Sequence, residues 1–344
     1  MIKCSIIGVT GYAGIELFRI LKQHPEVEIK HLFSHSSSGE NLADIYPQFT
    51  GEDLLLEKFA VEKLTDTDLV FTALPHGISQ EIVAEVYNQG IKVIDLSGDF
   101  RYQDHRIYEK WYQSKHNHPA LMKESVYGLV ELNRSAIKKA RLIANPGCYP
   151  TSSILGIYPL LAREMVRKNS IIVDAKSGVS GAGRGLKKVT HFCEVDESLK
   201  AYAITTHRHT SEIEANLSSI SGQQDVNISF TPHLVPMKRG ILSTIYLDLK
   251  QKMNRQDLTD IYRNFYSDDY FINIVENGSP ETKNVYGSNF CQLGLNVDSR
   301  LSRAIVVSVI DNLGKGAASQ AVQNMNIIFA LPEETGLKAA PIFP

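Results

Sequence analysis

The chain has 344 residues, with 36 lysines and arginines against 38 aspartates and glutamates, which gives a formal net charge of −2. This length suits two domains, and its 22% charged and 43% hydrophobic residues are ordinary values for a globular protein. The near-neutral balance argues against a general role on nucleic acid or on a membrane surface. It leaves room for a local basic pocket that takes an anionic small molecule.

The cysteine spacing and the length of the apolar runs argue against a zinc site, a disulfide framework and a membrane span. The four cysteines lie far apart and form no Cys-x-x-Cys pair, so neither a zinc site nor a disulfide framework is indicated. No apolar run approaches the length of about 18 residues that a membrane span needs. No signal-peptide pattern begins the chain, so we expect a reducing, cytoplasmic location.

The first predicted element is a strand that leads into a glycine-rich turn. Residues 2–7 alternate loosely between apolar and polar side chains, and helical spacing begins at Leu17. Between them lies the sequence Gly8-Val9-Thr10-Gly11-Tyr12-Ala13-Gly14. A strand, a glycine turn and a helix form the context of a dinucleotide fingerprint, because glycine lets a pyrophosphate approach the helix N-terminus. The spacing is Gly-x-x-Gly-x-x-Gly rather than Gly-x-Gly-x-x-Gly. We expect a bound dinucleotide; a tight turn without a ligand is the alternative.

The second predicted strand, residues 27–33, indicates which dinucleotide binds. In NAD enzymes an acidic residue at the end of this strand usually holds the ribose 2′-hydroxyl. Here the strand ends in Ser34-His35-Ser36-Ser37-Ser38-Gly39. Hydroxyls and an imidazole suit a 2′-phosphate, so we expect NADP, with Ser36 among its contacts. A solvated serine-rich loop is the alternative.

Two further strands complete the pattern of the first half. Residues 68–74 form a buried strand that ends in Pro75-His76-Gly77, and residues 92–96 form another that ends in Ser97-Gly98-Asp99-Phe100-Arg101. Alternation of strands and helices predicts an α/β fold with a parallel, doubly wound sheet. Ligands bind beyond the carboxyl ends of the strands in such sheets. The residues expected at that edge are Gly11, Ser36, His76, Gly98 and Arg101.

The segment Asn145-Pro146-Gly147-Cys148-Tyr149-Pro150-Thr151 contains the candidate nucleophile. It follows a short apolar strand, residues 142–144, and precedes a run with helical spacing from Ile154. Pro150 suits the first turn of a helix, which places Cys148 at a helix N-terminus. The free N–H groups there lower a thiol pKa and favour the thiolate. A buried, inert cysteine is the alternative.

The pattern changes after the cysteine. A β run over residues 170–175 opens into Lys176-Ser177-Gly178-Val179-Ser180-Gly181-Ala182-Gly183-Arg184-Gly185. A loop with four glycines, two serines and Arg184 suits a phosphate or a carboxylate. A solvated linker is the alternative.

Two histidines bracket an arginine in the segment His207-Arg208-His209. Thr210 or Ser211 can cap the helix that follows. A His-x-His pair could bind a metal, but we find no third ligand nearby and expect no metal site. An acid or base that titrates near neutral pH is the better interpretation.

The remaining sequence predicts long strands with few helices. We expect strands at residues 241–249, 272–276, 290–295 and 304–310, and helices at 257–265 and from Ala321 onward. This composition predicts an α+β second half with a large mixed sheet, which is a common dimer surface.

These features together indicate the thiol-dependent reduction of an activated acyl group. A cysteine thiolate can attack an acyl phosphate, donors at its helix end can hold the oxyanion, and a histidine can move the proton. Arginines can hold the departing phosphate.

The residues also resemble a known family, the N-acetyl-γ-glutamyl-phosphate reductases of arginine biosynthesis. The likeness spans nearly the whole chain. The motifs that carry it, in order, are Gly8-Val9-Thr10-Gly11-Tyr12-Ala13-Gly14, Leu74-Pro75-His76-Gly77, Ser97-Gly98-Asp99-Phe100-Arg101, Tyr127-Gly128-Leu129-Val130-Glu131, Asn145-Pro146-Gly147-Cys148-Tyr149-Pro150-Thr151, Ser177-Gly178-Val179-Ser180-Gly181-Ala182-Gly183-Arg184 and His207-Arg208-His209. Ser211 stands where the family often has proline.

The resemblance implies a reaction and roles for residues. The reaction is NADPH-dependent reduction of N-acetyl-γ-glutamyl phosphate to the semialdehyde and phosphate, by a cytoplasmic homodimer or homotetramer. Cys148 becomes the nucleophile, with His209 or His207 as acid/base and His209 preferred because it lies next to the helix start. Candidate substrate contacts are Arg101, Ser180 and Arg184. Candidate cofactor contacts are Gly8, Thr10, Gly11, Tyr12, Ala13, Gly14, Ser36, Pro75 and Asn312.

The resemblance also implies a discontinuous first domain, because the final helix returns to it. We expect a Rossmann-like NADP-binding domain of residues 1–147 and 312–344, and an α+β substrate and dimerisation domain of residues 148–311. Three alternatives stay open: aspartate-semialdehyde dehydrogenase, a carrier-protein-linked variant of the same chemistry, and an NADP-binding redox sensor that uses Cys148 as a reversible thiol.

Overall fold

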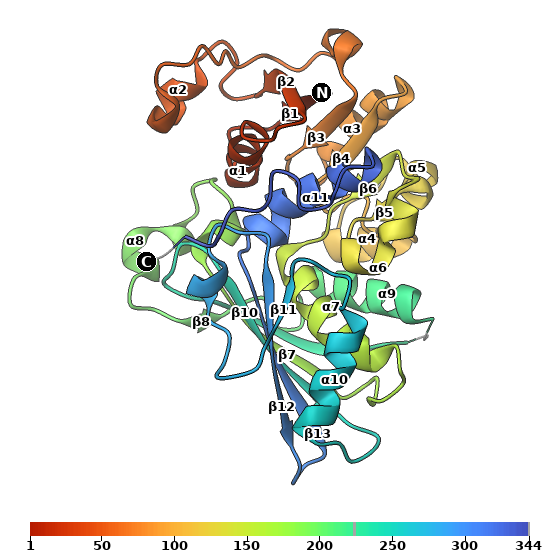
Figure 1. Ribbon diagram of the computed structural model, residues 1–344. Coiled ribbons are helices and arrows are strands. Elements are labelled where there is room, and N and C mark those ends of the chain that lie inside the picture. Colours follow the sequence, from red (N-terminus) through yellow and green to blue (C-terminus); the bar gives the residue numbers. More distant parts are fainter. Residues whose placement is uncertain (223–224, 343–344) are drawn as a thin grey trace. The chain divides into compact units, whose positions relative to one another are not determined.

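The chain forms two compact units in the computed structural model, which describes residues 1–222 and 225–342 (Figure 1). The first unit contains Met1–Pro146 and Ala317–Lys338, and the second contains Gly147–Gly316 and residues 339–342. Residues 147, 312–316 and 339–342 thus group with the second unit, whereas we expected them in the first. The reason is local packing: Gly316 lies against Cys148, and the Ile342 N–H donates to the Tyr286 carbonyl at 2.8 Å.

The first unit is built on a six-stranded sheet in which every strand pairs in parallel, in the order β2-β1-β3-β4-β6-β5. The inner strands β1, β3 and β6 are almost fully buried, as strands of a covered parallel sheet are, whereas the edge strand β2 is mostly half-buried. The sheet ends on β5, a two-residue strand that the sequence did not indicate. The strands are β1 Ile2–Ile7, β2 Val27–Phe33, β3 Leu69–Thr72, β4 Lys92–Asp95, β5 Val126–Tyr127 and β6 Leu142–Ala144.

The last helix of the chain, α11, belongs to the first unit. The Asn324 amide donates to the Gly128 carbonyl at 2.8 Å, and Asn326 Oδ1 lies 3.0 Å from His24 Nε2. These buried polar contacts attach the helix to the turn before α6 and to the turn after α1. The helices are α1 Tyr12–Leu21, α2 Leu42–Ile45, α3 Ser79–Asn88, α4 His105–Tyr112, α5 Pro119–Glu124, α6 Val130–Ile137 and α11 Ser319–Ile328.

The second unit contains a mixed seven-stranded sheet in the order β11-β12-β13-β10-β7-β9-β8. Along β10 buried and partly exposed residues alternate, because one face of the sheet packs against helices α7, α9 and α10 (Figure 1). The strands are β7 Ile171–Ser177, β8 Lys200–Ala201, β9 Ile228–Leu234, β10 Ile241–Asp248, β11 Ile272–Val275, β12 Cys291–Asp298 and β13 Arg303–Ile310. The helices are α7 Cys148–Leu161, α8 Phe192–Val195, α9 His209–Ser221 and α10 Arg255–Phe265.

The architecture is therefore the α/β fold with an α+β second domain that we expected. Helix α9 begins two to three residues earlier than predicted: its N-cap is Arg208, which has no side-chain cap, and Ser211 Oγ donates back to the Arg208 carbonyl. Over residues 1–222 and 225–342, none of the helices has the length and apolarity that a bilayer crossing requires.

Candidate active site

The glycine turn of the first unit is built for a close approach of backbone atoms. A Cβ on Gly14 would lie 2.3 Å from the Gly8 carbonyl oxygen, so only glycine fits at the point where α1 meets the turn. Gly11 is the N-cap of α1, no side chain caps it, and the first turn carries no acidic residue. The first N–H groups of a helix have no partner within the helix, so this uncapped start suits an anion.

The loop after β2 is held to this turn by hydroxyl groups. Thr10 Oγ1 lies 3.3 Å from Ser34 Oγ, and the Ser37 N–H donates to Ser34 Oγ at 3.3 Å. Ser36 lies inside this loop, and no acidic residue occurs between Ser34 and Gly39. The predicted 2′-phosphate position therefore carries hydroxyl and backbone donors.

A buried carboxylate network holds the turn of Pro75, His76 and Gly77. Both carboxylate oxygens of Asp99 accept from the Gly77 N–H at 2.9 Å, and the Tyr108 hydroxyl donates to Asp99 Oδ1 at 2.9 Å. Burial, and secondly the nearby Asp95, raises the pKa of Asp99 to about 6. The sequence analysis did not assign this role to Asp99, although its motif was recognised.

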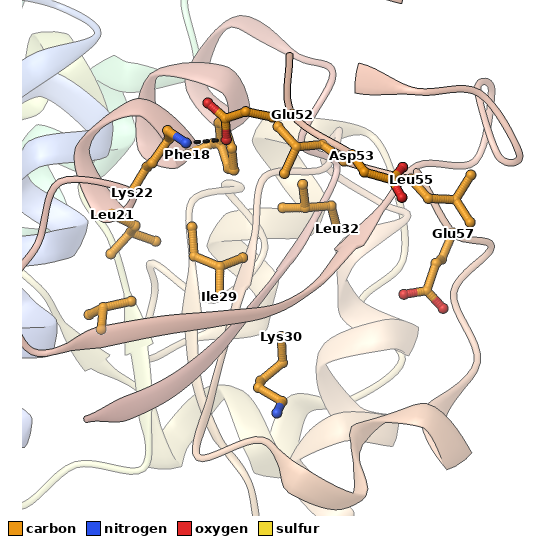
Figure 2. A pocket seen from close by; sticks show the side chains of 12 residues that line it. Phe18, Leu21, Lys22, Ile29, Lys30, Leu32, Glu52, Asp53, Leu55 and Glu57 are labelled. Carbon is orange, nitrogen blue, oxygen red and sulfur yellow. Dashed lines mark hydrogen bonds and ion pairs between the residues drawn. The ribbon is translucent and has the colours of Figure 1, made fainter. Parts of the chain in front are cut away.

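The cavity drawn in Figure 2 lies elsewhere in the first unit. It measures about 350 Å³ and is lined by α1, β2 and residues 52–57. The ion pair between Lys22 and Glu52 spans it. The cavity borders the end of α1 and residues between Val27 and Leu32 of β2, whereas the glycine turn precedes α1. It contains none of the predicted site residues.

The cysteine turn lies in the second unit and has the predicted form. Helix α7 begins at Cys148, its N-cap is Gly147, and the Thr151 N–H and hydroxyl both donate to the Gly147 carbonyl at 2.9 Å. A Cβ on Gly316 would lie 2.8 Å from the Cys148 Cβ, so a glycine is needed where the π-helical turn Gly314–Ala318 passes the cysteine. Cys148 is partly exposed, and the helix N-terminus favours negative charge on its sulfur.

The two histidines at the start of α9 lie against each other, with ring centroids 4.8 Å apart, and both rings pack on Tyr149. The His207 ring packs against Tyr149, Tyr202 and Phe230, with ring centroids 5.5–5.7 Å apart. Its Nδ1 accepts the His209 backbone N–H at 3.1 Å. Burial, and secondly the nearby Arg208, lowers the pKa of His207 to about 4. His207 is therefore neutral at pH 7 and has one ring nitrogen engaged.

Glu212 is a site residue that the sequence analysis missed. Its side chain is fully buried, its Oε1 accepts the Gly147 N–H at 2.8 Å, and its Oε2 lies 4.0 Å from His209 Nε2. One carboxylate therefore contacts the residue before the cysteine and one of the two histidines. The available signal was its position three residues after His209, on the same face of one helix.

Ser180 and Asn312 are joined in the second unit. The Asn312 Nδ2 donates to Ser180 Oγ at 2.9 Å, and its Oδ1 accepts the Gly240 N–H at 2.7 Å. Beside them, Arg239 pairs with the fully buried Asp311 at 3.0 Å, and Asp311 also accepts the Leu313 N–H at 2.8 Å. Both the Nδ2 and the Oδ1 of Asn312 thus have hydrogen-bond partners within this unit. A contact between Asn312 and the cofactor stays a prediction.

The two predicted arginines belong to different units. Arg184 is exposed in the loop after Ser180. Arg101 belongs to the first unit, where it is largely buried and its Nη2 donates to the Leu96 carbonyl at 2.9 Å. The described residues contain no cluster of three or more histidine, cysteine or acidic side chains that could hold a metal ion.

The fold and the cysteine site define a class of protein, and comparisons with known sequences agree. Residues 3–140 match the family described as "Semialdehyde dehydrogenase, NAD binding domain", and residues 148–312 match "Semialdehyde dehydrogenase, dimerisation domain". The solved aspartate semialdehyde dehydrogenase II of Vibrio cholerae superposes with a TM-score of 0.73 at 18% identity, covering 95% of this chain and 98% of that one. At this identity the likeness concerns the fold alone.

Curated relatives indicate the family within the semialdehyde dehydrogenase class to which this chain is similar in sequence. A protein of Halothermothrix orenii is 56% identical over the full length of both chains, and one of Caldicellulosiruptor bescii is 55% identical over 98% of both; each is named N-acetyl-gamma-glutamyl-phosphate reductase. The chain therefore belongs to the N-acetyl-γ-glutamyl-phosphate reductase family of oxidoreductases.

Proposed function

We propose that this enzyme reduces N-acetyl-γ-glutamyl phosphate to N-acetylglutamate semialdehyde and phosphate, with NADPH as the reductant, in arginine biosynthesis. The observation that carries the proposal is the helix-tip Cys148 with the Glu212–His209 pair beside it, in a chain 56% identical to a relative of that name. We further propose that it acts in the cytoplasm as a homodimer or homotetramer.

Cys148 acts as the nucleophile in this proposal. Its sulfur attacks the acyl carbon, the C–O bond to phosphate breaks, and a thioester forms. The N–H groups at the start of α7 are placed to stabilise the oxyanion that develops during the attack. Hydride reduction of the thioester then releases the aldehyde and the thiolate, which takes a proton from water.

His209 is the acid/base residue that the geometry favours over His207. It takes the proton from the Cys148 thiol and gives it to the departing phosphate oxygen. The neighbouring Glu212 carboxylate stabilises the imidazolium that forms between these two steps. His207 is packed among aromatic rings and stays neutral, so it serves to orient the backbone of His209.

The first unit fits an NADP molecule at the edge that contains Gly8–Gly14, Ser36 and Pro75. The close packing at Gly14 and the uncapped N-terminus of α1 provide the cradle for a pyrophosphate, and the serine loop suits a 2′-phosphate. When bound, the cofactor supplies the hydride. One solved relative of this fold, from Candida albicans, is described as an aspartate semialdehyde dehydrogenase with NADP.

Ser180, Arg184 and Arg101 are the proposed contacts to the substrate's phosphate and carboxylate. Ser180 is oriented by Asn312, which makes it the best defined of the three. Arginine suits both groups, because its planar guanidinium can form paired hydrogen bonds to each.

The deciding experiment measures the reverse reaction. Purified protein is mixed with N-acetylglutamate semialdehyde, NADP and phosphate, and NADPH formation is followed, with aspartate semialdehyde in a parallel reaction. Phosphate-dependent turnover of the acetylated substrate alone supports the proposal. Turnover of aspartate semialdehyde instead would move the enzyme to the activity named for the Vibrio cholerae structure. No turnover of either would favour a carrier-linked substrate or a redox sensor.

A further inference from the structure

A buried ion pair of the second unit, Asp311 with Arg239, takes no part in the proposed reaction. Asp311 follows the end of β13 and is fully buried, while the Arg239 side chain is 15% exposed. Arg239 Nε lies 3.0 Å from Asp311 Oδ2, and Arg239 Nη2 donates to Asp311 Oδ1 at 3.0 Å. Burying two charges costs so much solvation that such a pair is weak evidence for a stabilising role. Its geometry points to another role.

The Asp311 end of the pair shapes the turn that touches the cysteine. Asp311 Oδ1 accepts the Leu313 N–H at 2.8 Å and the Gly314 N–H at 3.0 Å. The Asp311 carbonyl oxygen accepts the Gly316 N–H at 2.9 Å. Gly316 in turn lies against Cys148, where an added Cβ would be 2.8 Å from the Cys148 Cβ and 3.2 Å from its Cα. One residue therefore fixes three N–H groups of the turn that packs on the nucleophile.

The Arg239 end of the pair is joined to the loop that contains Ser180. The Ser180 N–H donates to the Lys238 carbonyl at 3.1 Å, and the Gly178 N–H donates to the Gly240 carbonyl at 2.9 Å. Lys238 and Gly240 are the two neighbours of Arg239 in the chain. A Cβ on Gly178 would lie 2.8 Å from the Arg239 backbone nitrogen, so the two segments are in close contact. The guanidinium therefore connects the backbone beneath Ser180 with the turn at the cysteine.

We propose that the Asp311–Arg239 pair is a positioning unit, which sets the Cys148 sulfur relative to the phosphate contact at Ser180. Both groups must meet one substrate, because the thiolate attacks the acyl carbon that carries the phosphate; this step rests on the proposed function. A misplacement of about 1 Å between reacting groups can lower a rate about a hundredfold. Arginine suits the task, since its planar fork binds both carboxylate oxygens at once and lysine binds as a single point.

The first test is Arg239→Lys, which keeps a positive charge beside the buried Asp311 and removes the two-point contact. We expect kcat of the reverse reaction to fall at least about tenfold, because the turn at Cys148 is no longer held in one position. Alkylation of Cys148 by iodoacetamide should become several-fold faster, since a loosened turn exposes the sulfur. The alkylation is measured in a Cys193→Ser background, because Cys193 is exposed whereas Cys4 and Cys291 are buried.

The opposite directions of the two changes distinguish positioning from stability. A pair that only stabilises the fold would lower the melting temperature and leave both rates at the wild-type values, which would overturn the proposal. A fall in kcat with unchanged or slower alkylation would overturn it as well. Asp311→Asn, which keeps the shape of the side chain, is the second variant and should give the same two changes. Circular dichroism checks that each variant is folded.

Arg303→Lys is the matched control. Arg303 begins β13, at the opposite end of the strand from Asp311, and its Nε lies 2.7 Å from Asp248 Oδ1 on β10. It is the same kind of ion pair on the same strand, away from the cysteine turn. Arg303→Lys should leave both kcat and the alkylation rate unchanged. If it alters them as Arg239→Lys does, the effect is not specific to the pair and the proposal is wrong.

A second test follows the Ser180 end of the pair through the KM for phosphate in the reverse reaction. Ser180→Ala should raise this KM and leave the alkylation rate of Cys148 unchanged. Arg239→Lys should change both quantities, because the pair connects the two contacts. An unchanged KM for phosphate in Arg239→Lys would show that the pair does not reach Ser180 and would overturn the proposal.

The alkylation measurements separate this proposal from the proposed function, because they need no substrate. A wild-type chain without turnover would refute the proposed function. The alkylation rates of the wild type, Arg239→Lys and Arg303→Lys would still decide whether the pair positions Cys148: a faster rate in Arg239→Lys alone supports it, and equal rates in all three refute it.

Discussion

The glycine turn of the first unit offers backbone atoms to a ligand, whereas the histidine segment of the second unit offers side-chain atoms. The turn offers backbone N–H groups at a helix start, so its structure depends on where glycine is allowed. The histidine segment offers side chains whose roles depend on neighbours more than fifty residues away in sequence, such as Gly147 and Tyr149. Backbone sites are therefore visible in a local motif, whereas side-chain sites are completed by packing.

The largest effect is expected at the cysteine of the side-chain site. Cys148→Ala should lower kcat by at least about a thousandfold, because the thioester can no longer form. NADP binding, measured by fluorescence, should be unchanged, since it depends on the backbone site of the other unit. Substantial remaining activity would show that Cys148 is not the nucleophile.

The second prediction separates the two histidines. His209→Asn should lower kcat by about 10²–10⁴, the usual contribution of an acid/base group, and should remove one limb of the pH–rate profile. His207→Asn should change thermal stability more than the pH–rate profile, because its ring is packed among aromatic side chains. The assignment fails if only the His207 variant alters the profile.

The third prediction tests the backbone site with two glycines of one turn. Gly14→Ala should weaken NADP binding at least about tenfold and lower stability by about 1–3 kcal/mol, as overpacked sites do. The reason is the 2.3 Å approach of the added Cβ to the Gly8 carbonyl. Gly11→Ala is the control for packing, since its Cβ would meet nothing nearer than 3.6 Å. Similar melting temperatures for the two variants would refute the packing argument.

The smallest expected effect is the pH dependence of the free energy of unfolding. Because the pKa of His207 falls to about 4 in the folded chain, the unfolded chain binds more protons between pH 6.5 and 4. Stability is therefore lost as the pH falls through this range. The buried His116 of the first unit, whose pKa is also lowered to about 4, adds a loss of the same sign.

Denaturant unfolding at pH 7 and pH 5 measures this effect. His207→Asn should lose less stability between the two pH values than the wild type, whereas His116 continues to contribute in both proteins. An equal loss in variant and wild type would show that His207 does not stay neutral in the folded chain.

Much of the first unit and of the cysteine turn could be predicted because their signals are local. The strands at residues 2–7, 27–33 and 142–144 have the predicted bounds, since short apolar runs ended by glycine, serine or proline define buried strands. The helix start at Cys148 was likewise readable from Pro150 and Gly147. The resemblance of the motifs to a family supplied the reaction, which spacing alone could not.

The sequence by itself determined the local turns, which are the glycine turn before α1, the serine loop after β2 and the position of Cys148 at the start of α7. Only the tertiary structure decided that Glu212 contacts both Gly147 and His209, that His207 is enclosed by aromatic rings, and that Asn312 orients Ser180. The physical reason is that such contacts join residues distant along the chain, and the burial that shifts the pKa of His207 arises only when the second unit packs.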